Sequence, residues 1–136
     1  MRTVRISLTL VALTAVPAVA LAAGGSGRVL VPGCVRAHYK PRHLILGCDG
    51  SNYLKALTWS SWTTRRASGR GIDEINDCMP DCASGHFHAY PVAVKVSRPG
   101  RCARITHKVF RHFEFVYGSQ HPRGGRIQSG PLPCPA

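Results

Sequence analysis

Alternation of apolar and polar residues is the main structural signal along this chain. In residues 92–97 (VAVKVS) a valine occupies every second position, and in residues 112–118 (HFEFVYG) aromatic side chains do the same. Successive side chains of a strand point to opposite faces, so both segments predict half-buried β-strands. Residues 98–102 (RPGRC), which lie between them, predict a turn.

Upstream, two apolar runs flank an Asp-Gly pair. Residues 42–48 (RHLILGC) precede Asp49-Gly50, and residues 53–60 (YLKALTWS) follow it. Asp-Gly tolerates positive φ, so the pattern predicts a β-hairpin with these two runs as its strands. Further on, residues 69–75 (GRGIDEI) predict a short strand and residues 76–85 (NDCMPDCASG) an irregular loop punctuated by Pro80 and Gly85.

Short strands with turn signals between them, and no helical pattern of useful length, favour a mainly β fold. We expect a small antiparallel β-sandwich or barrel stapled by disulfides. The expected β domain covers residues 41–117, after an N-terminal extension at 23–40. Residues 118–136 are rich in turn signals and predict a loose tail, unless Cys134 ties it down.

Residues 1–22 carry the signature of a secretory signal peptide. Arg2 and Arg5 precede an apolar run that ends in small residues. Cleavage after Ala20 and after Ala22 both fit, and Ala22 is preferred because the flexible AGGSG follows it. The alternative is an uncleaved membrane anchor, although the run is shorter than the ~20 residues that span a bilayer. We therefore expect a secreted, extracellular protein with no transmembrane segment after cleavage.

Export decides how the cysteines are interpreted. In an exported chain an even number of cysteines predicts up to three disulfides, and six cysteines allow 15 pairings. In a reducing compartment Cys78, Cys82, His86 and His88 would instead make a set of four zinc ligands. We favour disulfides and expect neither a metal nor a cofactor. The cysteines are Cys34, Cys48, Cys78, Cys82, Cys102 and Cys134.

Several short motifs resemble a family of small secreted proteins of actinobacteria that has no established activity. The resemblance covers roughly residues 41–117, and Thr63 stands where the family pattern has glycine. It implies export from a bacterial cell and a compact disulfide-linked domain, and it implies no catalytic residue. The motifs are CDG (48–50), LTWSSW (57–62), ASGRG (67–71), NDCMPDCASG (76–85) and PVAV (91–94).

The histidines suggest an enzymatic alternative. His86 and His88 share one face if the segment is extended. Two imidazoles with Lys95 or Lys108 would suit general acid–base cleavage of a phosphodiester, as in small basic nucleases. The alternative interpretation is that both histidines are surface residues at the start of a strand. A serine hydrolase is disfavoured because the chain has no G-x-S-x-G motif.

Basic and aromatic residues suggest a binding surface. The net charge is +12, and removal of Arg2 and Arg5 leaves 16 Lys and Arg against 6 Asp and Glu, a net +10. Trp59 and Trp62 are expected on opposite faces of a strand. An exposed Trp62 beside Arg65 and Arg66 could stack on a sugar or a base. Alternatively, both tryptophans fill a small core.

The acidic residues are few and clustered. Asp73, Glu74, Asp77 and Asp81 lie within nine positions of an otherwise basic chain. They match no calcium-loop signature, and a glycosidase pair among them is a weaker possibility. We expect a solvated acidic loop that relieves the local positive charge.

These patterns favour a non-enzymatic binding or structural module outside the cell. Its charge would attract anionic cell-envelope polymers, such as teichoic acids and acidic lipid head groups, or nucleic acid. The alternative is a small secreted hydrolase, nuclease-like or metal-dependent, that uses His86 and His88. The sequence does not predict an oligomeric state, and the positive charge could equally serve solubility.

Overall fold

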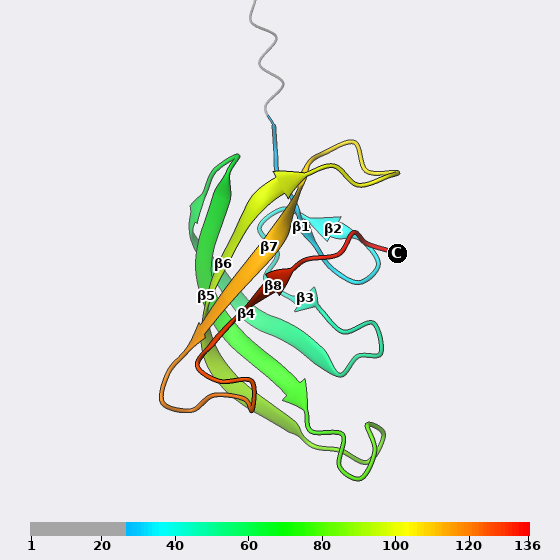
Figure 1. Cartoon of the computed structure of the whole chain (residues 1–136), viewed down its shortest axis with the longest axis vertical. Helices are drawn as coiled ribbons and strands as arrows, with labels where there is room; N and C mark the ends of the chain where they lie inside the picture. The colour runs from blue at the N-terminus through cyan, green and yellow to red at the C-terminus, as the bar shows by residue number, and fades with distance from the viewer. Residues whose placement is uncertain (1–26) are drawn as a thin grey trace, which may run out of the picture.

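The chain folds around one curled antiparallel sheet. The computed structural model describes residues 27–136, so the predicted signal peptide at 1–22 lies outside the described residues. Six strands pair in the order of the sequence (Figure 1): β3 (Leu44–Ile45), β4 (Asn52–Trp62), β5 (Arg66–Asn76), β6 (Phe87–Gly100), β7 (Val109–Tyr117) and β8 (Ile127–Pro131). The described residues contain no helix, which confirms the predicted mainly β fold.

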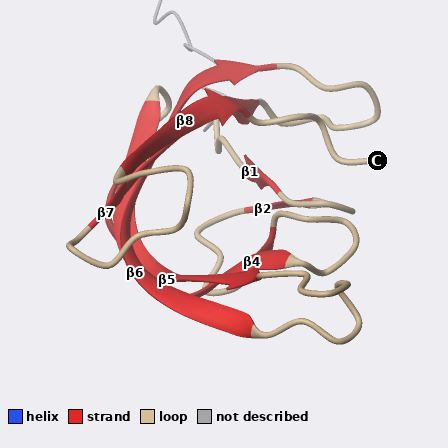
Figure 2. Cartoon of the chain, turned by 60° about the horizontal axis from the view of Figure 1, so that its bottom comes forward, coloured by secondary structure: helices blue, strands red, loops and turns tan. Residues whose placement is uncertain are grey.

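A second, two-stranded sheet lies inside the curl. It consists of β1 (Val31–Pro32) and β2 (Ala37–His38), and Figure 2 shows it on the concave side of the larger sheet. Leu30 bridges Val109 of β7, so this segment is attached directly to the sheet. Among the described residues no helix is long and apolar enough to span a membrane.

The core lies between the inner face of the curl and this N-terminal segment. The predicted alternation in β6 is confirmed, because Val92, Val94 and Val96 are all buried. Phe115 and Tyr117 of β7 are buried on the same side. The remaining buried apolar residues come from several segments: Val29, Val31, Leu44, Leu54, Leu57, Ala67, Val109, Phe110 and Leu132.

Strand boundaries differ from the predicted ones. The expected 42–48 strand is reduced to the two residues of β3, although Gly50 forms the turn with φ of 79°. β5 is longer than expected, because it pairs with β6 along its whole length and with β4 between Ala67 and Ile75, with register shifts. The turn predicted at 98–102 is wrong for residues 98–100, which continue β6 to its pairing with Val109.

The sheet also extends past the expected limits of 41–117. β8, within the predicted tail, pairs with β7 from Val116↔Ile127 to His112↔Pro131. Val29 and Val31, within the predicted N-terminal extension, are buried in the core. The segments around Val29–Val31 and Ile127–Pro131 therefore belong to the folded domain.

The six cysteines form three disulfides, so the expected stapling is confirmed. The pairs are Cys34–Cys48, Cys78–Cys82 and Cys102–Cys134. Cys34–Cys48 ties the β1–β2 segment to the loop after β3, and Cys102–Cys134 ties the last residues to the β6–β7 connection. Disulfides are typical of oxidising, extracellular compartments, with which this pattern is consistent.

The two tryptophans lie on the same side of β4, so the expectation of opposite faces is wrong. Pairing of β4 with β5 shifts register between Trp59 and Ser61, where β4 carries an extra residue. The two rings consequently meet edge to face, with centroids 4.7 Å apart. Both pack against the core.

Two glycines of β5 make room for this packing. Gly69 and Gly71 lie on the inner face, beside the irregular part of β4. A Cβ at Gly69 would collide with the carbonyl oxygen of Thr58, and one at Gly71 would lie 2.8 Å from Cδ2 of Leu57. The ASGRG motif is therefore explained by close approach of β4 to β5.

Two acidic residues are buried in β5, so the expectation of a solvated acidic loop is wrong for Asp73 and Glu74. Glu74 forms an ion pair with Lys55 of β4. Asp73 is 1% exposed, and its Oδ2 accepts a 2.6 Å hydrogen bond from the Tyr117 hydroxyl. Burial raises the pKa of Asp73, and the hydrogen bond from Tyr117 opposes this rise only in part.

Asp73 should make stability depend on pH. Its folded pKa is raised, so the folded state binds the proton more tightly, and stability falls as pH rises from about the unfolded pKa of ~3.9 through the folded pKa. Asp73→Asn removes this dependence and keeps an acceptor for Tyr117. We expect urea denaturation to show a stability advantage of Asp73→Asn over the native chain that grows with pH and then levels.

The hydrogen bond itself is tested by Tyr117→Phe. This variant leaves the buried carboxyl without its hydroxyl donor and should cost about 1–3 kcal/mol at pH 7. An Asp73→Asn advantage that stays constant with pH, together with an unchanged stability of Tyr117→Phe, would contradict the assigned pair.

Candidate functional site

The outer, convex face of the sheet carries a group of basic side chains. We define the convex-face basic cluster as Arg66 of β5, Lys95 and Arg98 of β6, and His112 of β7. These residues line one hollow of about 440 Å³ together with Ser61, Ser68, Ser97 and Glu114. The cluster is thus built by three neighbouring strands.

Strand register brings these residues together. Arg66 pairs with Ser97, and Ser97 pairs with His112, so the three form a row across β5, β6 and β7. The Cα atoms of Arg66 and His112 are separated by two interstrand spacings, or ~10 Å. Ala67 and Val96, their neighbours in sequence, are buried on the inner face. Alternation therefore directs this row outward. Arg98 is in phase with Val96 and joins the hollow where its φ of 56° interrupts the alternation of β6.

The arginines of the cluster have no acidic partner. In the described part of the chain three ion pairs occur, between Lys55 and Glu74, His88 and Asp77, and Lys95 and Glu114. None contains an arginine. Lys95 Nζ lies 2.7 Å from Glu114 Oε1, so its charge is partly neutralised. Arg66 and Arg98 are exposed and leave their guanidinium groups free for an external anion.

Positive charge continues along β5. Arg70 lies on the same strand as Arg66, four residues on and hence on the same face, at ~13 Å. Arg70 is also exposed. Repeated charges at such intervals suit a linear polyanion, since each phosphate of the chain can meet a separate cation.

A hydroxyl orders the turn that leads into the cluster. Thr63 Oγ1 accepts hydrogen bonds from the backbone N–H groups of Arg65 (3.2 Å) and Arg66 (3.1 Å). It donates to the Arg66 carbonyl at 2.8 Å. The Thr63 hydroxyl thus fixes the backbone at Arg65 and Arg66, the two arginines predicted to bind. Arg65 itself lies in the exposed turn, outside the hollow.

Trp62, in contrast, lies in an aromatic group on the inner side. Its Nε1 donates to the Val29 carbonyl at 3.1 Å, and its ring meets Phe110 at 5.7 Å and Tyr39 at 5.2 Å. These contacts favour the core-filling interpretation. Trp62 is not among the residues that line the hollow beside Arg66.

His88 pairs with a carboxylate at the end of the sheet. Its Nε2 lies 2.9 Å from Asp77 Oδ2. Asp77 Oδ1 also accepts the backbone N–H groups of Met79 at 3.1 Å and His86 at 2.9 Å. The His88 hydrogen bond, and then these two backbone donors, lower the pKa of Asp77 well below its usual range. His86 takes part through its main chain.

The zinc interpretation of this region is wrong. Cys78 and Cys82 bond to each other and close the 77–86 loop, so neither is a thiolate ligand. Among the described residues no three His, Cys, Asp or Glu side chains come together as a metal site.

The nuclease-like constellation is not assembled either. His88 lies on the inner side of β6, in alternation with Val92, whereas Lys95 lies on the outer side and seven residues, or ~23 Å, along the strand. Lys108 directly precedes Val109, which pairs with Gly100 at the other end of β6. Neither lysine can therefore act on a group bound at His88.

Sequence reasoning singled out Arg66 and missed its neighbours. In the sequence Arg98 is one of many basic residues, and no pattern points to His112. Their convergence depends on which residue of β6 faces which residue of β5 and β7. Cross-strand register is not visible in the periodicity of any one segment.

Comparisons with known proteins give no match: no protein-family model matches the chain, and no curated protein or solved structure is significantly similar to it. The geometry described above therefore carries the functional argument.

The 77–86 loop gives a direct test of Asp77. Asp77→Ala should speed amide hydrogen exchange at Met79 and His86, because both N–H groups lose their acceptor. The lowered pKa means that Asp77 holds the loop at pH 7 and releases it only as pH falls below the usual carboxyl range. Exchange resolved by residue measures both effects.

Asp81→Ala is the matched control within the same loop. Asp81 Oδ1 accepts the Ser84 N–H at 2.8 Å, so this variant should free Ser84 and leave Met79 and His86 protected. Equal exchange of all three amides in both variants would show that Asp77 has no special role.

Proposed function

We propose that this protein is a secreted, non-enzymatic module that binds anionic polymers of the cell envelope through the convex-face basic cluster. The observation that carries the proposal is that Arg66, Arg98 and His112 line one hollow, where neither arginine has a carboxylate partner. Guanidinium groups present planar donors that match phosphate oxygens. A phosphate-bearing polymer such as teichoic acid is the proposed ligand.

Three further observations support an extracellular setting. The apolar segment at residues 6–21 follows two arginines, the six cysteines are all paired, and the motifs of residues 48–94 resemble secreted actinobacterial proteins. The proposal therefore places the protein outside a bacterial cell, where such polymers are displayed.

The double variant Arg66→Gln/Arg98→Gln tests the cluster. Each lost phosphate contact should reduce the magnitude of the slope of log affinity against log salt concentration by about 1. In the double variant this magnitude should therefore be smaller by about 2. Affinity for purified teichoic acid at low salt should fall accordingly. Binding is measured by biolayer interferometry at several salt concentrations.

Arg42→Gln/Arg126→Gln is the control, because it removes two exposed charges away from the cluster. Equal losses in the two double variants would mean that only the net charge matters and would overturn the assigned site. Tighter binding of single-stranded DNA than of teichoic acid, with the same dependence on Arg66 and Arg98, would reassign the polymer to nucleic acid.

A second candidate function is a small secreted hydrolase centred on His88. The observation in its favour is the hydrogen bond to Asp77, since a carboxylate that orients an imidazole is a common feature of general-base sites. The Asp77 and His88 side chains border a hollow of about 580 Å³ with Tyr90, Arg123 and Gln128. His86 is not among the residues that border this hollow.

Histidine variants separate the two functions. The binding module should keep its affinity for teichoic acid in His86→Ala and in His88→Ala. A hydrolase should instead lose turnover of ester or phosphodiester substrates in His88→Ala while its fold, followed by circular dichroism, is unchanged. Turnover that depends on His88 would replace the binding proposal.

A further inference from the structure

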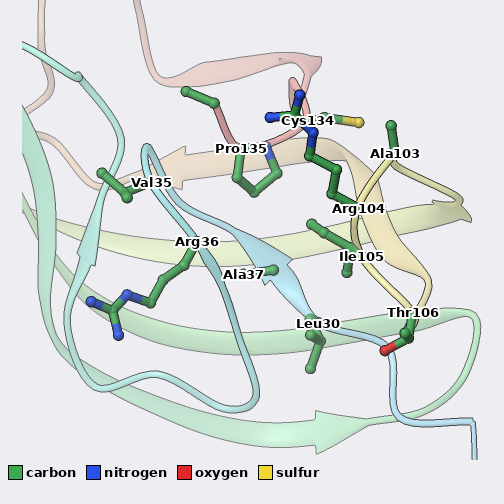
Figure 3. Close-up of a pocket in the computed structure, with 11 residues that line it drawn as sticks. Leu30, Val35, Arg36, Ala37, Ala103, Arg104, Ile105, Thr106, Cys134 and Pro135 are labelled. Atoms are coloured by element: carbon green, nitrogen blue, oxygen red, sulfur yellow. The ribbon is translucent and has the colours of Figure 1, made fainter.

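A separate hollow lies at the other side of the molecule, between segments far apart in sequence. It has a volume of about 680 Å³ and is formed by the β1–β2 segment, the β6–β7 connection and the last residues of the chain (Figure 3). Its size falls within the range of about 300–1,000 Å³ that is typical of small-molecule sites. None of its lining residues belongs to the convex-face basic cluster.

The walls of this hollow are fixed by covalent and backbone bonds. The Cys102–Cys134 disulfide joins two of the three segments. The Ala136 N–H donates to the Cys34 carbonyl at 3.1 Å and connects the third. Ile105 N–H donates to the Cys102 carbonyl at 3.3 Å within the β6–β7 connection. The hollow is therefore largely preformed, which reduces the ordering cost of binding.

Most of the lining is apolar and partly exposed. Figure 3 shows Leu30, Ile105, Ala37 and Pro135 around the space. Val35, at its edge, is 71% exposed. When an apolar ligand covers such side chains, burial of their apolar surface lowers the free energy by roughly 25 cal/mol per Å².

Two arginines mark the rim. Arg104 lies along the wall beside Cys134 and Pro135, and Arg36 extends from the opposite edge (Figure 3). Neither forms an ion pair in the described residues. Arg104 also has a φ of 65°, a left-handed conformation that costs free energy in a non-glycine residue and recurs at ligand sites.

We propose that this hollow binds an amphiphile with one acyl chain and one anionic head group, of the fatty-acid class. The acyl chain lies against Leu30, Ile105 and Pro135, and the head group meets the guanidinium of Arg104. The apolar lining selects for a chain, and the cationic rim selects for a negative head group. This site is independent of the convex-face basic cluster and of the polymer proposed to bind there.

Calorimetric titration with dodecanoate, kept below its micelle-forming concentration, tests the proposal. Saturable binding of one equivalent is expected, whereas dodecyltrimethylammonium, with the same chain and the opposite charge, should bind at least tenfold more weakly. Arg104→Gln should weaken dodecanoate about tenfold through loss of a charge-assisted hydrogen bond. Val35→Ser changes a highly exposed position, so it should reduce affinity without unfolding the chain.

Two controls make the outcomes distinguishable. Arg126→Gln removes an exposed arginine outside the hollow and should leave dodecanoate binding unchanged. Arg66→Gln/Arg98→Gln should also leave it unchanged, while Arg104→Gln should keep teichoic acid affinity. The proposal would be overturned by the absence of saturable binding or by equal binding of the two detergents. It would also be overturned if Arg104→Gln bound dodecanoate as tightly as the native chain.

Discussion

Burial of one concave surface determines this structure. A single curled sheet cannot cover its own inner face, so the valines and aromatic residues of β6 and β7 need another segment to exclude water. The chain before β3 supplies that cover, with Val29 and Val31 inserted into the core and both tryptophan Nε1 groups bonded to carbonyls of the covering segment. Cys34–Cys48 fastens the cover to the loop after β3, and Cys102–Cys134 ties the last residues to the β6–β7 connection. By the loop-entropy estimate, a bridge that closes about 15 residues contributes about 3 kcal/mol, which is a large share of the stability of a small domain.

This arrangement also decides where a ligand can bind. The core occupies the inner face around Val92, Val94 and Val96. The outer face of β5, β6 and β7 and the margins of the cover stay open to a ligand, as does the end of the sheet near His88. The convex-face basic cluster lies on the outer face, because the strand alternation that buries Ala67 and Val96 turns Arg66 and Ser97 outward. The hollow near Arg104 lies at the margin of the cover, because it forms where the cover, the β6–β7 connection and residues 134–136 meet.

How far the sequence predicts this fold depends on whether a feature is local. The valine alternation in β6 and the Asp-Gly turn are local, and both are found as expected. The same-face placement of Trp59 and Trp62 is not local, because it depends on a register shift against β5. β8 has no apolar alternation of its own and becomes a strand by pairing with β7. For the candidate site, Arg66 was visible in the sequence, but its meeting with Arg98 and His112 required the pairing of three strands.

The acidic side chains pair with residues other than arginine, and this leaves the positive charge of the arginines uncompensated. In the described residues Glu74 and Glu114 pair with lysines, Asp77 with His88, and Asp73 with Tyr117. Asp49 and Asp81 accept hydrogen bonds from Ser51 and Ser84 in their own turns. Because local structure engages every acidic side chain, no arginine within residues 27–136 forms an ion pair with a side-chain carboxylate. Unpaired like charges repel one another and work against the compact state, and an external polyanion relieves that repulsion. Arginine stays charged at any physiological pH and presents a planar set of donors that matches phosphate. Solubility alone would be served equally well by unpaired lysines. A surface that leaves arginines unpaired therefore favours phosphate binding over a role in solubility alone.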